Sequence, residues 1–435
     1  MSTAPSDPAP PSAGGHCRGL DEWLALLEKN HPVEIDLGLE RIAEVARRLA
    51  LPRPARRVVT VAGTNGKGSC VRTLEQLLLA QGQRVGAYSS PHLLRYNERI
   101  RIQGLKVDDA ALCRVFALID SARGEVSLTY FEVGTLAALL LMAEADLDVA
   151  VLEVGLGGRF DAVNLVDPDI AVITAIDIDH RQWLGDTREQ IALEKAGIAR
   201  PGGTVVVADP DPPRSLEGKL LELGGRHLFL GRDYRYRLGG GLLGMELVGA
   251  EEGGPPVVVD DLPQPVLPLP SVLAALQVGL LLGLDLERQR VADLCRALAL
   301  PGRFEQRLFR GRRVVLDVAH NPAAAAYLRD RLAAQGEGDL ALVAAIMADK
   351  DAAGFVAALA PVTGHWYLGN LANLPRALAA EQLAGLVYTG GQHGTVHGDI
   401  RAAFAAALDA TPPGGLVVVC GSFFTVAAIT EFMEV

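Results

Sequence analysis

Short apolar runs alternate with amphipathic stretches along most of the chain. The runs are rich in Val, Ile and Ala, and they predict buried strands at 57–62, 84–88, 148–154, 170–176 and 204–208. Apolar residues recur at helical spacing between and around these runs, which predicts helices at 23–27, 39–49, about 69–80, 136–144, 188–198 and 271–282. Short buried strands that alternate with helices predict an α/β fold with a mostly parallel sheet covered on both faces.

Two further stretches depart from this rhythm. The segment from Tyr234 to Val259 alternates polar and apolar residues around glycine pairs, which predicts a small hairpin region. Leu300-Pro301-Gly302-Arg303 reads as a linker, after which strands are predicted at 314–318, 341–346 and 416–420, separated by Ala-rich helices. We therefore expect a disordered tail at 1–18, a large domain at 19–299 and a smaller α/β domain at 300–435.

Composition narrows the class of protein. The 435 residues are 49% hydrophobic and 21% charged, which is typical of a globular protein, and the formal net charge of −11 argues against a nucleic-acid partner. The longest apolar stretch, Ser271–Leu284, is too short to span a bilayer, so no membrane partner is expected. Five scattered cysteines and a start without signal-peptide features predict a protein of the reducing cytoplasm.

A glycine-rich loop follows the first predicted strand and opens a helix. Glycines allow backbone N–H groups to surround a phosphate, and the helix N-terminus adds a favourable dipole. Lys67 is placed to neutralise phosphate oxygens, and Ser69 to reach a metal ion, although the spacing differs from that of the common P-loop. The alternative is a flexible turn with a solvated lysine. The predicted nucleotide-binding residues of the loop are Gly63, Thr64, Asn65, Gly66, Lys67, Gly68 and Ser69.

Polar residues also stand just past other predicted strands. Glu153 ends one strand beside several glycines, where a carboxylate can hold Mg²⁺, or where it can simply cap a helix or pair with a cation. Ser90 and His180 follow two further strands, but taken alone a serine before proline is usually a turn residue and a lone histidine is more often structural. Lys195, next to Glu194 on a predicted helix, would by itself be a solvated charge pair.

Nine further segments accompany the variant phosphate loop in order along the chain: 35–41, 88–92, 128–132, 152–159, 179–180, 194–198, 300–304, 317–322 and 420–423. Through these segments the chain resembles the folylpolyglutamate synthase/dihydrofolate synthase family of Mur-type ligases. The resemblance implies a P-loop-type, mostly parallel ATP-binding domain followed by a smaller Rossmann-like glutamate-ligase domain. It also implies that ATP activates a carboxylate as an acyl phosphate, which the amine of L-glutamate attacks. Domain closure is a hypothesis that fits this course, because it would exclude water from the acyl phosphate.

The same resemblance assigns roles to individual residues. It implies two Mg²⁺ ions held by Ser90, Glu153, His180 and Lys195, with Lys195 converted by CO₂ to a carbamate. Catalytic roles fall to Lys67, His180, Lys195 and His320, and nucleotide contacts in the rest of the chain to Ser271, Arg303 and Asp317. Ser271 stands where the family often has Asn, so the chain departs from the family pattern at this nucleotide contact.

The implied substrates are 7,8-dihydropteroate, reduced folates and L-glutamate. The residues matched to their binding are Ile35, Asp36, Leu37, Thr129, Tyr130, Phe131, Glu132, Phe160, Asp161, Ala162 and Ser422. Tyr130 and Phe131 could instead be core, and Asp317 and His320 could instead cap a strand end. Two other functions stay open: a Mur-type ligase of a cell-wall precursor, and an ATP-binding module without catalysis. A monomer is expected, because the sequence contains no heptad or exposed repeat.

Overall fold

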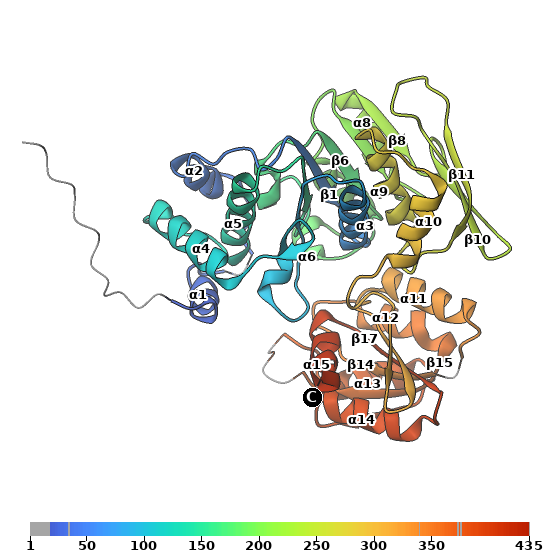
Figure 1. The fold of residues 1–435 in the computed structure, drawn as a ribbon. Helices are drawn as coiled ribbons and strands as arrows, with labels where there is room; N and C mark the ends of the chain where they lie inside the picture. Colours follow the sequence, from blue (N-terminus) through green and yellow to red (C-terminus); the bar gives the residue numbers. More distant parts are fainter. Residues whose placement is uncertain (1–17, 34, 339, 372–373, 375, 435) are drawn as a thin grey trace, which may run out of the picture.

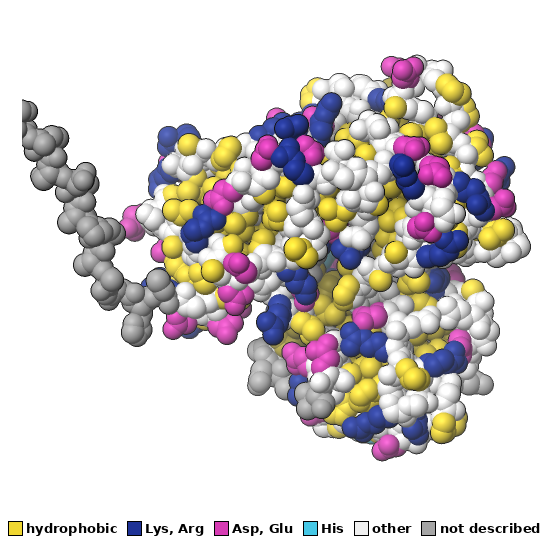
Figure 2. Space-filling model, in the orientation of Figure 1, with side chains coloured by type: hydrophobic (Ala, Val, Ile, Leu, Met, Phe, Trp, Pro, Cys, Tyr) yellow, Lys and Arg dark blue, Asp and Glu magenta, His cyan; other side chains and the backbone are white. Residues whose placement is uncertain are grey.

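The computed structural model describes residues 18–434 except 34, 339, 372–373 and 375, and the predicted tail at 1–18 lies outside it apart from Arg18. The chain forms two bodies, one carrying α1 to α10 and one carrying α11 to α15, and the surface is hollowed where they meet (Figures 1 and 2). The two large sheets fall on either side of residue 300. The domain boundary at that residue stays a prediction.

The first body is built on an eight-stranded sheet in the order β4-β3-β2-β5-β1-β6-β7-β8. The strands from β2 to β8 in this order are parallel, whereas β3 is antiparallel to both β2 and β4. The strand bounds are β1 Arg57–Ala62, β2 Val85–Tyr88, β3 Ile100–Ile102, β4 Leu105–Lys106, β5 Val149–Glu153, β6 Ile170–Ile173, β7 Thr204–Val207 and β8 Arg226–Phe229.

Helices cover both faces of this sheet, as the apolar strands require. One face packs against helices of the N-terminal half, and the other against α3, α9, α10 and a small sheet. The helix bounds are α1 Leu20–Leu27, α2 Glu40–Arg48, α3 Lys67–Ala80, α4 Asp109–Arg123, α5 Tyr130–Glu144, α6 Arg181–Leu184, α7 Arg188–Ala196, α8 Arg214–Leu223, α9 Leu269–Leu281 and α10 Arg288–Ala297, with short 3₁₀ turns at Tyr96–Arg99 and Ala162–Leu165.

The predicted hairpin at 234–259 is instead a three-stranded antiparallel sheet. Its strands are β9 Arg235–Gly239, β10 Leu242–Leu247 and β11 Val257–Pro263. The chain turns between β9 and β10 at one of the glycine clusters, Gly240-Gly241, and the third strand extends beyond the predicted end of the region. Leu243, Met245 and Leu262 point from this sheet into the core beneath α9, which explains the alternation in the sequence.

The second body has a six-stranded sheet in the order β12-β13-β17-β14-β15-β16, parallel except for β12. α11 to α13 pack on one face, and α14 and α15 on the other. The bounds are β12 Glu305–Phe309, β13 Arg312–Leu316, α11 Pro322–Ala334, β14 Leu340–Ala344, α12 Ala352–Leu359, a 3₁₀ turn at Ala360–Val362, β15 Thr363–Gly369, α13 Ala380–Thr389, β16 Gly394–His397, α14 Ile400–Ala410, β17 Leu416–Cys420 and α15 Phe423–Glu434.

The predicted α/β class with two sheets is therefore confirmed, and three boundaries that bear on function were wrong. α3 begins at Lys67 rather than near Ser69, so Lys67 and Gly68 belong to the first turn of the helix. α5 begins at Tyr130 rather than Leu136, because Thr129 caps it. β6 ends at Ile173, which leaves residues 174–180 as a loop. Within the described residues, none of the helices combines the length and apolarity that crossing a membrane requires.

Candidate functional site

The glycine-rich loop joins β1 to α3 at the carboxyl edge of the parallel strands. Gly66 precedes the helix with φ of +90°, a conformation that favours glycine. A Cβ built on Gly66 would lie 2.2 Å from Oγ of Ser271, so the start of α9 closely covers the loop. The N–H of Thr64 donates to the carbonyl of Ala175 (2.7 Å), which ties the loop to the segment after β6. The loop is thus held between the segment after β6 and the start of α9.

Lys67 projects its amine back over this loop. Its Nζ donates to the carbonyls of Gly63 (3.0 Å) and Thr64 (3.3 Å). Burial lowers the pKa of Lys67, and the carboxylates of Glu153 and Asp179 oppose that shift. A phosphate anion beside this amine would favour its charged form.

Glu153 ends β5 and faces the first turn of α3. Only 4% of the residue is exposed, and a Cβ on Gly68 would lie 3.6 Å from Oε2 of Glu153. The backbone N–H of Ser90, in the turn after β2, donates to this carboxylate. Burial raises the pKa of Glu153, whereas Lys67 and Arg303 hold it down. The carboxylate of Glu153, Ser90 and the phosphate loop therefore lie close together, as a binding site for a nucleotide-bound divalent cation requires.

Lys195 lies at the end of α7, beneath the loop that follows β5. A Cβ on Gly158 would lie 2.7 Å from the carbonyl of Glu194, so this glycine permits the close approach of loop and helix. Lys195 is 3% exposed, and burial, followed by repulsion from Lys67, lowers its pKa to about 7. The solvated charge pair considered from the sequence is therefore excluded for Lys195.

His180 occupies the position before α6 with φ of +52°. Burial lowers the pKa of His180 to about 4, so its imidazole is neutral at pH 7 and can act as a metal ligand. Among the described residues, no three His, Cys, Asp or Glu side chains are grouped as a metal site. The predicted ligand set contains only two such residues, Glu153 and His180. It fits Mg²⁺ if Ser90 and a carboxylate-bearing Lys195 complete it, and these ligand assignments stay predictions.

The three predicted substrate segments also lie together. Arg41 pairs with Asp36 (2.6 Å) and with Glu132 (3.2 Å), which joins the segment at 35–37 to the start of α5. The N–H of Gly38 donates to the carbonyl of Phe160 (3.2 Å), which brings the segment at 160–162 to the same place. Ile35 and Leu37 are half-buried there, Phe160 is 44% exposed and Ala162 is buried. The three predicted substrate segments therefore lie next to one another in the first body.

The aromatic residues of α5 differ in their surroundings. A Cβ on Gly155 would lie 2.6 Å from Cζ of Phe131, so the ring of Phe131 rests directly on the glycine loop that follows Glu153. Tyr130 instead packs edge-on against Tyr96, with centroids 5.6 Å apart. Phe131 is therefore the better placed of the two to meet a flat ring next to the metal-binding residues.

Several predicted substrate residues are already occupied by structural contacts. The carboxylate of Asp161 accepts from the N–H groups of Leu156 (2.8 Å) and Val163 (2.9 Å), and burial raises its pKa to about 6. Thr129 and Glu132 form a reciprocal capping box at the start of α5. The polar groups of these side chains are therefore used to support the backbone, and they are not free to bind a substrate.

The capping box gives a stability prediction. Replacing Thr129 with Ala should lower the free energy of unfolding by about 1 kcal/mol, because the N–H of Glu132 loses its acceptor. Thr129→Ser keeps the hydroxyl and should stay close to the unsubstituted protein. Urea unfolding followed by circular dichroism measures both variants. Equal stability of the Ala and Ser variants would show that the cap contributes nothing.

The predicted residues of the second body differ in how far their polar groups are already engaged in contacts within that body. The guanidinium of Arg303 lies 4.8 Å from the ring centroid of Phe423 and interacts electrostatically with Glu153 in the first body. Asp317 accepts from the N–H groups of Phe304 and Ala319, each at 2.8 Å, which is the strand-end cap considered from the sequence. Ser422 shares its hydroxyl with Thr425 (2.7 Å) and is buried. Of these three, Arg303 is the one whose charge reaches the phosphate site.

The structure adds three residues that the sequence did not single out. Asp179 accepts from Lys350, with Nζ 2.6 Å from Oδ1, and lies 3.6 Å from Nε2 of His320. Burial alone would raise the pKa of Asp179, but His320, His180 and Lys350 hold it well below its usual value. Asn321 exchanges hydrogen bonds with Asn65 of the phosphate loop (3.0 and 3.3 Å). Placement after β6 is the signal that could have found Asp179, whereas Lys350 carries no such signal in the sequence.

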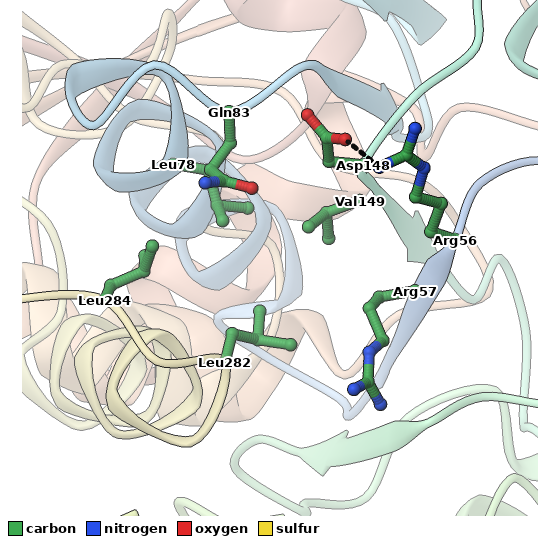
Figure 3. Close-up of a pocket in the computed structure, with 8 residues that line it drawn as sticks. All are labelled: Arg56, Arg57, Leu78, Gln83, Asp148, Val149, Leu282 and Leu284. Atoms are coloured by element: carbon green, nitrogen blue, oxygen red, sulfur yellow. Dashed lines mark ion pairs between the residues drawn. The ribbon is translucent and has the colours of Figure 1, made fainter.

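A separate pocket lies at the opposite edge of the first sheet (Figure 3). It is lined by Arg56, Arg57 and Gln83 together with apolar side chains, and Arg56 pairs with Asp148 at 3.5 Å. Arg57 and Val149 begin β1 and β5, so the pocket sits at the amino ends of the strands. Ligands of parallel sheets bind at the carboxyl ends, where Lys67 and Glu153 lie. The pocket of Figure 3 is therefore not the candidate active site.

Comparison with known proteins agrees with this geometry. The model of the Mur ligase middle domain matches residues 61–232, and that of the Mur ligase glutamate ligase domain matches residues 302–423. Each match begins next to a feature already described. The first starts at the end of β1, directly before the phosphate loop, and the second starts at the linker before β12.

Similar proteins cover almost the whole chain. The dihydrofolate synthase/folylpolyglutamate synthase of Escherichia coli is 43% identical over 95% of this chain and 96% of its own, and that of Haemophilus influenzae is 39% identical over 95% and 98%. The structure of E. coli FolC in complex with DHPP and ADP superimposes with a TM-score of 0.89 at 42% identity, covering 96% of this chain and 98% of that one. A bifunctional folylpolyglutamate synthase/dihydrofolate synthase with Mn, AMPPNP and L-glutamate bound gives 0.86 at 42% identity, over 96% and 98%. The chain belongs to the dihydrofolate synthase/folylpolyglutamate synthase family of the Mur ligases.

Proposed function

We propose that this chain is an ATP-dependent ligase that joins L-glutamate to 7,8-dihydropteroate and to reduced folates, releasing ADP and phosphate. The observation that carries the proposal is the convergence on Lys67 of charged groups from both bodies: Glu153, Asp161 and Asp179 from the first and Arg303 from the second. Relatives over 40% identical carry this activity in their names, and their structures contain ADP, DHPP and L-glutamate. The reaction is placed in the cytoplasm and the enzyme is expected to act as a monomer.

The first step is phosphoryl transfer to the substrate carboxylate. A carboxylate oxygen attacks the γ-phosphorus of ATP, the bond to the bridging oxygen breaks, and ADP leaves an acyl phosphate behind. Lys67 offsets the charge on the transferring group, and the backbone N–H groups of the loop from Gly63 to Ser69 orient it. The divalent cations, held by Ser90, Glu153, His180 and Lys195, would supply further charge neutralisation on the phosphate oxygens.

The second step is amide formation. The glutamate amine attacks the acyl carbon, one amine proton is lost, and the tetrahedral intermediate collapses with release of phosphate. The acyl phosphate must be shielded from water until the amine arrives. The second body can supply that cover, because Asn321 contacts Asn65 of the phosphate loop and His320 lies 3.6 Å from Asp179 of the loop between β6 and α6. The catalytic role proposed for His320 belongs to this step, since its Nε2 lies 3.6 Å from Oδ2 of Asp179.

We also infer that Lys195 is carbamylated. Lys195 is buried, and its amine, if protonated, would be repelled by Lys67. A carbamate on Lys195 reverses the charge and supplies two oxygens. Addition of CO₂ to the free amine forms the N–C bond and releases one proton. With this group, the predicted ligand set gains a second carboxylate beside that of Glu153.

Phe131 supplies a prediction about substrate recognition. Replacing it with Leu should raise KM for dihydropteroate about tenfold, because the flat ring beside Gly155 is lost, while KM for ATP stays within about twofold. Tyr388→Leu, which changes an exposed aromatic residue on α13, is the control and should alter neither constant. Equal increases in both KM values for Phe131→Leu would assign the ring to the core. Asp161 is a poorer test, because its carboxylate supports the backbone.

ADP release tests the proposed function. Purified protein with ATP and Mg²⁺ should release ADP only when glutamate and a pteroate or folate acceptor are both present. The cell-wall alternative has lost its support, because the named relatives that match nearly the whole chain act on folates. The non-catalytic alternative predicts no acceptor-dependent ADP. ADP release at the same rate with and without the acceptor would contradict the proposed ligase activity.

A further inference from the structure

A buried ion pair joins the two bodies beside the phosphate loop. Nζ of Lys350 lies 2.6 Å from Oδ1 of Asp179, and each side chain is only 8% exposed. Asp179 belongs to the loop between β6 and α6, and Lys350 to the loop between β14 and α12. Residues 171 positions apart in the sequence are therefore brought together at the carboxyl ends of two different sheets.

Asp179 is the centre of a larger bridge. Its Oδ1 accepts from the N–H of His180 (2.8 Å), while Oδ2 accepts from Nδ2 of Asn321 (3.5 Å) and lies 3.6 Å from Nε2 of His320. One carboxylate thus contacts the predicted metal ligand of its own loop and three side chains of the second body, Lys350 included. Moving Lys350 away would leave that carboxylate with its weaker, longer contacts to the second body.

A second contact lies next to the first and shares a residue with it. Asn321 and Asn65 exchange amide hydrogen bonds at 3.0 and 3.3 Å. Asn321 also caps α11, because its Oδ1 accepts from the N–H of Ala324 at 2.9 Å. The start of α11 is therefore anchored on the phosphate loop through Asn65 and on the loop before His180 through Asp179.

Ion pairs of this kind are poor sources of net stability, because desolvation of both charges offsets their attraction. What a buried pair does enforce is relative position, since either partner left alone is a buried uncompensated charge. The carboxylate of Asp179 and the amine of Lys350 lie in different bodies, so this pair fixes how one body is placed against the other. In a ligase whose reacting groups are contributed from both bodies, that position decides whether the step occurs.

We propose that Lys350 is a positioning residue for the ligase reaction: through Asp179 it seats the second body on the phosphate loop, with Asn321 and His320 in register over Asn65 and His180. The inference rests on the proposed function. Lys350 itself touches no reacting atom in this arrangement. Its removal should therefore lower kcat and leave the nucleotide site of the first body intact.

Lys350→Met is the test variant, because it keeps the length of the side chain and removes the charge. We expect kcat for dihydrofolate formation to fall about 10²-fold, the loss associated with a misplacement of about 1 Å, with ADP affinity and KM for glutamate unchanged. Lys219→Met removes an exposed lysine from an ion pair within α8 and should leave all three constants as they were. Lys350→Arg should restore most of kcat. A rise in KM for glutamate with kcat unchanged would make Lys350 a substrate contact and overturn the proposal.

A double-mutant cycle tests the route through Asp179. Once Asp179→Asn has removed the ion pair, adding Lys350→Met should cost no more than about twofold in kcat. A further 10²-fold loss in that background would show that Lys350 acts elsewhere. Circular dichroism and calorimetric ADP binding establish that each variant is folded.

Hydrogen–deuterium exchange supplies a readout that needs no ligase activity. In the nucleotide-free protein, peptides covering 62–69 and 317–324 should exchange faster in Lys350→Met than in Lys219→Met, because the bridge holding them is broken. Unaltered exchange together with unaltered kcat would refute the inference while leaving the ligase in place. Faster exchange in a protein that forms no folate product would refute the ligase and leave the bridge in place.

Discussion

Replacing Lys67 with Met should lower kcat for dihydrofolate formation by about 10²- to 10³-fold, the range for loss of one preorganised charged donor. The amine lies over the phosphate loop, held by the carbonyls of Gly63 and Thr64. Those carbonyls cannot be its main partners during the reaction, because phosphate oxygens are stronger acceptors for an ammonium group. The amine can therefore transfer its hydrogen bonds from the loop to the nucleotide without moving far.

The electrostatic surroundings set the size of this effect. Burial lowers the pKa of Lys67, and in the ligand-free protein Glu153 and Asp179 supply the opposing negative charge. Steady-state kinetics at saturating ATP measures kcat, and Lys219→Met is again the control for loss of an exposed ammonium group. A kcat within threefold of the unsubstituted enzyme would show that the loop alone carries the phosphate and that Lys67 is a structural lysine.

The second large effect concerns Lys195. Lys195→Ala should abolish measurable ligase activity, and formate or acetate together with bicarbonate should restore part of it, because a small carboxylate can enter the space left by the carbamate. Lys219→Ala should neither lose activity nor respond to these anions. Full activity of Lys195→Ala would refute the carbamate, and loss without any rescue would reduce Lys195 to a residue that α7 needs for packing.

The carbamate also has a pH dependence and a direct signature. Only the neutral amine adds CO₂, and with a pKa of about 7 the neutral fraction rises tenfold per pH unit below 7 and levels off above it. The rate of CO₂ addition should follow that curve, whereas carbamate occupancy at fixed CO₂ should keep rising above pH 7, because the addition releases a proton. Carbon-13 NMR with labelled bicarbonate measures this occupancy without turnover. In protein without CO₂, the folded state binds fewer protons than the unfolded state between pH 7 and the ordinary lysine pKa, so Lys195 makes unfolding free energy increase with pH across that window.

The sequence predicted the parts of the fold that local pattern controls. The apolar runs of β1, β5 and β17 and the glycine loop before α3 carry their own signals, because fully buried strands need continuous apolar residues and a phosphate loop needs glycine. The early start of α5 was missed although Thr129-Tyr130-Phe131-Glu132 is a capping-box pattern. Reading that pattern would also have warned that Thr129 and Glu132 are committed to the helix.

The rest of the site depends on contacts that no local pattern encodes. Nothing near Lys350 in the sequence distinguishes it from a solvated lysine, and its buried partner, Asp179, lies in the other sheet. Lys195 looks like half of a surface pair until α7 is packed against Gly158. The resemblance to a known family supplied Lys195, whereas Lys350 required the relative placement of the two bodies.

Product analysis by mass spectrometry tests the central claim most directly. Purified protein would receive ATP, Mg²⁺ and L-glutamate with either 7,8-dihydropteroate or tetrahydrofolate. The account predicts a product one glutamyl residue heavier than the acceptor in both reactions, with ADP formed in equal amount. Product from tetrahydrofolate alone would keep the ligase and return Phe131 and its neighbours to the core. Absence of both products in a protein that still binds ADP would contradict the account.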